Sequence, residues 1–123
     1  MDASNQTQID NNLDRRDFNR IKTKGKVLLK CMSPPFEIFN AEIIDVSANG
    51  LNISTKKPLA LNLPVQLSVC TVNDDNVFFM NGKITWCEKS TNGQGEPEYN
   101  AGIEIQFDRR NKDYHDWRAL YIA

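Results

Sequence analysis

Between residues 24 and 107 the chain is divided into short runs of β-branched, aromatic and aliphatic residues by clusters of Gly, Pro, Asn and Asp. This division constrains the fold more than any other feature, because runs of this length and composition are typical of strands. Six strands are expected, at residues 26–31, 36–46, 51–55, 65–72, 77–88 and 99–107. Six strands with regular turns favour an all-β fold, either an antiparallel barrel or a sandwich.

Turn residues account for the breaks between these runs. Pro34 and Pro35 place a turn after the first run, and the segment from Pro58 to Pro64 makes an irregular link. The polar residues 73–76 predict a hairpin turn. Gly82, inside the fifth run, predicts a bulge or a bend.

The two ends of the chain lack the strand pattern. Residues 1–14 contain few apolar side chains and no period, which predicts a disordered leader, and residues 15–23 are expected to form an arm ahead of the barrel. At about residues 110–122, apolar side chains recur at spacings of three and four: Tyr114, Trp117, Leu120 and Tyr121. This spacing predicts a C-terminal helix that covers an end or an edge of the barrel. The length of 123 residues predicts one domain, residues 15–123.

Charge, cysteine spacing and apolar content disfavour several kinds of function. The formal net charge is −1, whereas a domain that grips many phosphates is usually basic, so nucleic acid is disfavoured as a ligand. Cys31, Cys70, Cys87 and the single histidine, His115, lack the close pairing of a zinc site, so no metal is expected and the cysteines are expected to be buried thiols. No apolar run is as long as a membrane span and no signal-peptide pattern is present, so a cytoplasmic protein without membrane contact is expected.

No residue pattern indicates an enzyme. The chain has no Ser/His/Asp or Cys/His arrangement, and His115 is expected at the surface of the helix or in its packing. The acids Asp74 and Asp75, and Glu96 and Glu98, stand in turns without partners and are expected to be solvated.

The stretch RRDFNR, residues 15–20, places three arginines in six positions. By itself it is typical of a solvated charge run. In an extended chain Arg16 and Arg20 share a face, with Phe18 between them in no assigned role. Their guanidinium groups match the O6/N7 edge of guanine and the oxygens of phosphate.

The stretch DVSANG, residues 45–50, lies between the second and third expected strands. Alternation predicts that Ile44 and Val46 point inward while Asp45 and Ser47 point outward together. After the turn the alternation continues, with Leu51 and Ile53 inward and Asn52 and Ser54 outward. By itself the stretch is typical of an ordinary hairpin turn.

Together the two stretches indicate a guanine-nucleotide site. A carboxylate such as that of Asp45 accepts hydrogen bonds from guanine N1–H and the N2 amino group, while arginines bind the Hoogsteen edge and the phosphates. No Gly-rich phosphate loop is present, so a triphosphate in the usual cradle is not expected.

The motifs RxxxR (Arg16 to Arg20) and DxSxxG (Asp45 to Gly50), in this order, resemble those of the PilZ domain family. GKITW (Gly82 to Trp86) and AGIEIQF (Ala101 to Phe107) resemble later strands of the same family. The resemblance extends from about Arg15 to the terminal helix.

The resemblance implies a six-stranded antiparallel β-barrel that acts as a standalone receptor for the bacterial second messenger cyclic di-GMP. It implies that Arg16 and Arg20 contact guanine edges and phosphates. Asp45 and Ser47 would hold a guanine on the barrel wall, and Gly50 would leave room for it.

The resemblance also implies features at the margin of this site. An arginine just before RxxxR, here Arg15, favours two stacked cyclic di-GMP molecules over one. Asn49, Trp86 and Gly102 are expected at the periphery. The family generally implies motility, biofilm or exopolysaccharide control through a protein that the sequence does not identify. Composition predicts a mobile arm and a rigid barrel wall, so a ligand bound by both would order the arm on the barrel.

Two alternatives to a cyclic di-GMP receptor stay open at this point. One is a small β-barrel that binds single-stranded nucleic acid, with arginines on phosphates and aromatic side chains stacked on bases. The other is a ligand-independent protein-interaction module on the same fold.

Overall fold

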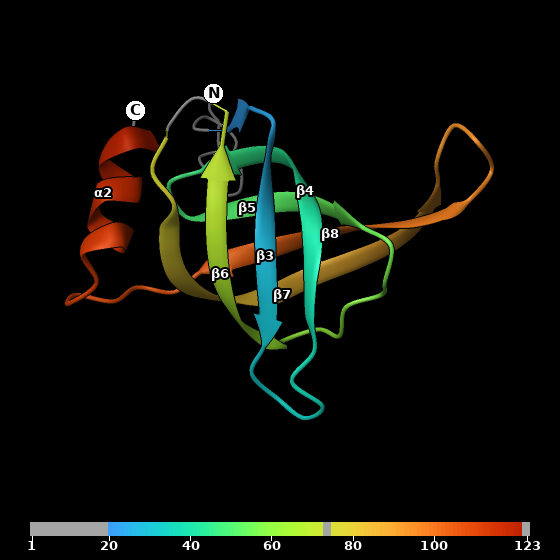
Figure 1. The fold of residues 1–123 in the computed structure, drawn as a ribbon, viewed down its shortest axis with the longest axis horizontal. Helices are drawn as coiled ribbons and strands as arrows, with labels where there is room; N and C mark the ends of the chain where they lie inside the picture. Colours follow the sequence, from blue (N-terminus) through green and yellow to red (C-terminus); the bar gives the residue numbers. More distant parts are fainter. Residues whose placement is uncertain (1–19, 73–74, 122–123) are drawn as a thin grey trace, which may run out of the picture.

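Six antiparallel strands close into a barrel in the computed structural model, which describes residues 20–72 and 75–121 (Figure 1). The strands are β3 (Gly25–Cys31), β4 (Ile38–Ser47), β5 (Gly50–Thr55), β6 (Pro64–Thr71), β7 (Phe78–Thr91) and β8 (Pro97–Ile105). Their order is β4-β3-β6-β7-β8-β5, and the pairing of β4 with β5 closes the ring. The expected all-β fold with a six-stranded barrel is confirmed.

Alternation within the strands determines which side chains form the core. In β3, Val27 and Leu29 are buried, whereas Lys26 and Lys30 face out. The same pattern fills the barrel from every strand, with Ile43, Val46, Leu51, Ile53, Leu67, Val69, Met80, Ile84 and Ile103 among its buried residues. Burial of one such aliphatic side chain contributes about 1.5–3 kcal/mol.

The single described helix, α2 (Lys112–Tyr121), packs beside β7 (Figure 1). Asn111 caps its first turn, because the side-chain Oδ1 accepts hydrogen bonds from the backbone N–H groups of Asp113 and Tyr114. Trp117 is fully buried, with its ring edge-on to Phe78 at a centroid distance of 5.4 Å. Helix α2 therefore supplies aromatic side chains to the core.

The face of α2 that enters the core differs at one residue from the expected face. Tyr114, Trp117 and Tyr121 are buried as expected, but Leu120 is exposed. Leu120 lies about 60° around the helix from Trp117 and about 100° from Tyr121, at the side of the buried stripe.

A two-residue strand that the sequence pattern did not predict, β2 (Ile21–Lys22), pairs with β4. Its partners are Val46 and Asp45. Part of the expected arm, residues 20–23, is therefore already attached to the barrel. The expected leader (1–14) and the rest of the arm (15–19) lie outside the described residues.

Strand β4 departs from the expected alternation near its middle. The register with β5 shifts between Ile43 and Asp45, so the strand accommodates a bulge. Ile43 consequently lies in the core and Ile44 is 40% exposed, so the expected inward position of Ile44 is wrong. Val46 is buried as expected.

Ser47 also differs from its expected outward position, because it is only 6% exposed. It ends β4 where α2 packs, and Nε1 of the Trp117 indole donates a hydrogen bond of 2.9 Å to its carbonyl oxygen. The expected joint outward patch of Asp45 and Ser47 is therefore reduced to Asp45.

Strands β7 and β8 continue past the barrel as a two-stranded ribbon (orange loop in Figure 1). Ser90 pairs with Glu98, and the side chain of Asn92 accepts hydrogen bonds from two backbone N–H groups of the connecting turn. The bulge expected at Gly82 occurs instead between Ile84 and Trp86. At Gly82 the strands stay in register and the β8 backbone comes close.

The three cysteines are free but differ in exposure. Cys31 is buried, Cys87 is half-buried and Cys70 is exposed, so the expectation of buried thiols is wrong for Cys70. Burial raises the pKa of the Cys31 thiol, and the nearby Glu37 carboxylate adds to this effect. In the part of the chain described here, no group of three or more His, Cys, Asp or Glu side chains is placed to hold a metal ion. No helix among these residues is both long and apolar enough to cross a bilayer.

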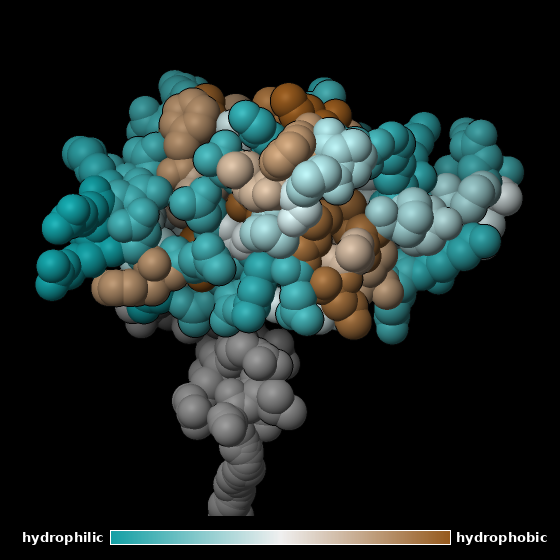
Figure 2. Space-filling view, turned by 90° about the horizontal axis from the view of Figure 1, so that it is seen from below, coloured by the Kyte–Doolittle hydropathy of each residue, from teal (hydrophilic) through white to brown (hydrophobic). Residues whose placement is uncertain are grey.

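Exposed apolar side chains occur in the loops as well as on the strands. Met32 and Phe36 lie in the β3–β4 turn, and Leu61 lies in the β5–β6 link. Figure 2 views the molecule from below and shows hydrophobic (brown) areas interrupted by hydrophilic (teal) residues. Scattered exposure of this kind is ordinary for a protein surface.

Candidate functional site

Arg20 and Asp45, each from one of the two sequence motifs, form an ion pair at the start of β2. Nη1 of Arg20 donates a hydrogen bond of 2.9 Å to Oδ1 of Asp45, and the two side chains are 28% and 16% exposed. The pairing of Lys22 with Asp45 fixes this approach. The structure therefore brings together two residues that are 25 positions apart in sequence.

The carboxylate of Asp45 has a second partner that no motif indicated. Nδ2 of Asn52 donates a hydrogen bond of 2.9 Å to the same Oδ1, and the two residues are cross-strand neighbours in β4 and β5. Two donors on one oxygen hold the carboxylate in a defined orientation.

The row of cross-strand neighbours continues from Asn52 through Gly102 in β8 to Trp86 in β7. A Cβ atom at Gly102 would overlap Nε1 of Trp86, so the indole lies directly against the Gly102 backbone. Trp86 is 38% exposed. Asp45, Asn52, Gly102 and Trp86, called the cross-barrel row below, thus combine a carboxylate, an amide, a bare backbone and an aromatic ring.

Helix α2 holds the turn that carries the DxSxxG motif. Besides the bond from Trp117 to Ser47, the guanidinium of Arg118 donates to the side-chain Oδ1 of Asn49. The carbonyl oxygen of Asn49 also accepts a hydrogen bond of 2.8 Å from the N–H of Ile105. The turn is therefore tied to both α2 and the end of β8.

Gly50 has a packing reason to be glycine. It pairs with Glu104 in β8, and a Cβ atom there would overlap the carbonyl oxygen of Ile103. The close approach of the β8 backbone therefore requires glycine with or without a ligand.

The remaining predicted site residues, Arg15 and Arg16, lie outside the described residues, as does Phe18. The residue that sequence reasoning missed as a site residue is Asn52. Its outward position was expected, but its role follows from the register that sets it opposite Asp45.

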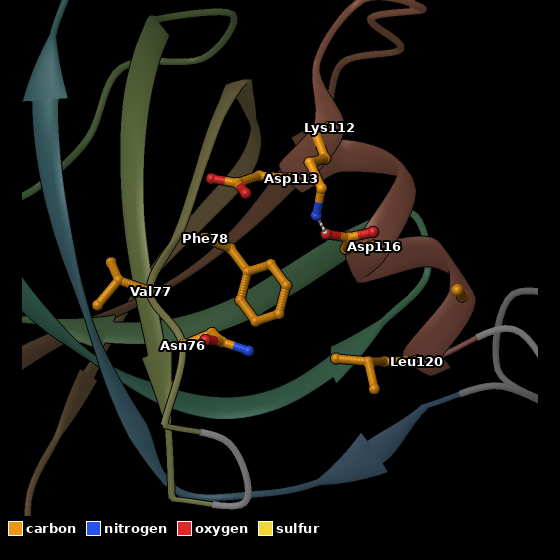
Figure 3. Close-up of a pocket in the computed structure, with 8 residues that line it drawn as sticks. Asn76, Val77, Phe78, Lys112, Asp113, Asp116 and Leu120 are labelled. Carbon is orange, nitrogen blue, oxygen red and sulfur yellow. Dashed lines mark hydrogen bonds and ion pairs between the residues drawn. The ribbon is translucent and has the colours of Figure 1, made fainter.

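A cleft lies between α2 and the start of β7 and has a volume of about 430 Å³ (Figure 3). The Phe78 ring points toward the helix, and Lys112 pairs with Asp116 at 2.6 Å. This hydrogen bond raises the pKa of Lys112. With Asp113 also on its wall, the cleft carries more negative than positive charge and does not suit an anionic ligand.

The residues considered for catalysis have structural partners. Nε2 of the exposed His115 donates to the carbonyl oxygen of Arg109. Glu98 accepts a hydrogen bond from Ser54, and Glu96 from the side chain of Asn92. The expectation that Glu96 and Glu98 lack partners is therefore wrong, and Glu98 lies in β8 rather than in a turn.

Comparison with known proteins gives one family and several similar folds. The family model described as "PilZ domain" matches residues 14–120. No curated protein matches the chain in sequence.

Two solved structures represent the similar folds. The Escherichia coli structure "PilZ domain with c-di-GMP of YcgR" aligns with a TM-score of 0.60 and 13% identity, covering 83% of this chain and 85% of that one. The K. pneumonia MrkH–c-di-GMP complex aligns with a TM-score of 0.65 and 15% identity, covering 82% of this chain and 48% of that one. The chain thus spans about half the length of MrkH, and at these identities the likeness concerns the fold.

Proposed function

The chain belongs to the PilZ domain family, and from this membership we propose that it is a receptor that binds cyclic di-GMP beside the Arg20–Asp45 pair. The observation that carries the proposal is the meeting of the RxxxR and DxSxxG motifs in that ion pair. Two solved structures with a similar fold, those of the YcgR domain and of MrkH, contain c-di-GMP.

The chemistry of the pair suits a guanine nucleotide. In the free protein Arg20 occupies the carboxylate oxygen that guanine N1–H or N2–H would use. Binding would therefore exchange one charge-assisted contact for two, with guanine on Asp45 and Arg20 on the Hoogsteen edge or a phosphate. Both side chains of the existing pair keep some exposure, 28% for Arg20 and 16% for Asp45, so a ligand can approach the pair and replace Arg20 on the carboxylate.

The other motif residues have graded roles in this proposal. Arg16 would bind a second guanine edge or phosphate, and Arg15 would favour two stacked ligands by offsetting part of their charge. Ser47 is almost buried, so we expect a weaker contact from it than from Asp45. Gly50 and Asn49 act through the shape of the turn.

The half-exposed indole of Trp86 is a peripheral surface on which a base can stack. It lies against the Gly102 backbone in the cross-barrel row. Stacking on an aromatic side chain contributes about 1–3 kcal/mol per base.

The proposed signal is an ordering of the arm on the barrel. The position of β2 limits the part of the arm that ligand binding can order. Because residues 21–22 already pair with β4, ligand-dependent ordering is expected at residues 15–19. Hydrogen exchange with and without cyclic di-GMP measures this directly. We expect new protection at residues 15–19 and little change in β2; unchanged protection at saturating ligand would remove the ordering step while leaving binding intact.

The proposed receptor is not an enzyme, takes no cofactor, is cytoplasmic and acts through a protein partner in motility, biofilm or exopolysaccharide control. After prolonged incubation with the protein, we expect cyclic di-GMP to stay unhydrolysed.

A salt titration distinguishes cyclic di-GMP from the alternative ligand, single-stranded nucleic acid. Tight oligonucleotide binding that falls steeply with salt, without binding of cyclic di-GMP, would replace the proposed function with that alternative.

A further inference from the structure

The side-chain amide of Asn52 has one satisfied and one unsatisfied end. Nδ2 donates to Asp45, and this contact orients the amide because the opposite orientation would place its oxygen against the carboxylate. Oδ1 is buried, and within residues 20–72 and 75–121 it has no hydrogen-bond partner. A buried acceptor without a donor is unfavourable and rare in native proteins, so it requires an explanation.

The neighbours of Asn52 explain why the protein itself leaves this oxygen unpaired. On one side, the Asp45 carboxylate offers only acceptors. On the other side, Gly102 has no side chain, and the Trp86 indole lies against its backbone without donating to Asn52. The cross-barrel row therefore places acceptors of Asp45 and Asn52 next to each other, that of Asn52 being buried in the free protein.

We propose that Asn52 reads the guanine base: when guanine replaces Arg20 on Asp45, the Oδ1 of Asn52, which is buried in the free protein, accepts a hydrogen bond from the 2-amino group. This inference rests on the proposed function. The Watson–Crick edge of guanine carries three N–H bonds, one on N1 and two on N2. The two carboxylate oxygens accept the N1–H and one N2–H, which leaves the second N2–H for the neighbouring amide oxygen.

The same geometry discriminates against other bases. Adenine has an acceptor at N1 and only C–H at position 2, so it would leave Asn52 Oδ1 buried and unpaired. A site built to receive a hydrogen bond rejects a ligand that lacks the donor more strongly than an apolar site rejects a small change of shape.

Asn52 would thus have two separable effects. Through Nδ2 it positions the Asp45 carboxylate, which affects every ligand that Asp45 binds. Through Oδ1 it recognises the 2-amino group, which affects only ligands that carry one. Equal losses for both ligands indicate positioning alone, and a larger loss for the ligand with the 2-amino group indicates that Asn52 contributes to its recognition.

The test compares cyclic di-GMP with cyclic di-IMP, whose bases lack only the 2-amino group, by calorimetric titration of the full chain. The wild-type protein is expected to prefer cyclic di-GMP. Asn52→Ala is expected to weaken binding of both ligands and to reduce that preference about tenfold. Asn52→Thr is a second variant, because threonine is favoured in strands and the protein should still fold if Asn52→Ala does not. Asn40→Ala, at an exposed position of β4 opposite Leu28, is the matched control and should leave the preference unchanged.

The outcomes distinguish failure of the proposed function, binding of cyclic di-GMP, from failure of this inference, recognition of the 2-amino group by Asn52. A folded wild-type protein that binds neither nucleotide overturns the proposed function and this inference together. Wild-type protein that binds both nucleotides equally overturns the inference alone, whatever the variants do. Equal losses for both nucleotides in the Asn52 variants would reduce Asn52 to a positioning residue.

Discussion

Single residues of the two motifs serve packing and ligand chemistry to different degrees. Arg20 and Asp45 are partly exposed and contact each other through their side chains, so a ligand can take the place of Arg20 while Asn52 keeps the carboxylate oriented. Gly50, in contrast, is fixed by the β8 backbone. A substitution in a motif can therefore abolish binding in two ways, by removing a contact with the ligand or by destabilising the fold.

Gly50→Ala tests this distinction. Because the added methyl group would overlap the carbonyl oxygen of Ile103, we expect the free energy of unfolding to fall by about 1–3 kcal/mol or more without any ligand. Gly93→Ala is the matched control, since a Cβ there meets nothing within 4 Å and should be nearly neutral. Denaturant unfolding of both variants measures the difference. Wild-type stability in Gly50→Ala would mean that its glycine serves the ligand alone.

Among the elements, α2 connects the core to the motif turn. Trp117 fills the space beside Phe78 and donates to Ser47, and Arg118 reaches Asn49. The helix thus holds the turn that follows Asp45. Elements that hold a binding loop by buried contacts set how precisely its ligand groups are placed.

Trp117→Phe keeps an aromatic ring but removes the indole N–H. We expect a loss of about 1–3 kcal/mol in stability, because a buried carbonyl loses its donor and some ring volume is lost. Leu120→Ala, on the exposed side of the same helix, should change stability much less. Thermal unfolding compares the two, and equal effects would argue against the hydrogen bond to Ser47 as a stabilising contact.

Most of the elements could be predicted from sequence, because alternation and turn residues are local signals. The six strands and the helix occur at the expected places, with boundaries shifted by up to three residues. Strand β2 could not be predicted, since two residues carry no period and pair only because β4 lies beside them. The bulge near Ile44 likewise depends on the register with β5.

The site could be predicted in part for the same reason. Asp45 and Arg20 stand in recognisable motifs, and the structure places them in contact. The burial of Ser47 and the bond from Asn52 to Asp45 depend on tertiary packing. Such contacts are absent from the linear pattern.

At the scale of the whole molecule, a chain with net charge −1 has its arginine cluster in residues 15–20, which end at the first described residue, Arg20. Closure removes the free edges of the sheet and keeps the cross-barrel row fixed. A ligand with two phosphates and two guanines matches this local charge, although the chain as a whole does not attract polyanions. The central claim is therefore specific binding of cyclic di-GMP at Asp45.

Calorimetric titration of cyclic di-GMP into wild-type protein, Asp45→Asn and Glu42→Gln tests that claim most directly. Both substitutions remove one carboxylate charge from β4, but Glu42 is exposed and makes no contact with Arg20. We predict saturable binding to the wild type and to Glu42→Gln, with one or two ligands per chain, and at least tenfold weaker binding to Asp45→Asn, or about 1.4 kcal/mol. Equal affinity of all three folded proteins, or no binding to the wild type, would contradict the account.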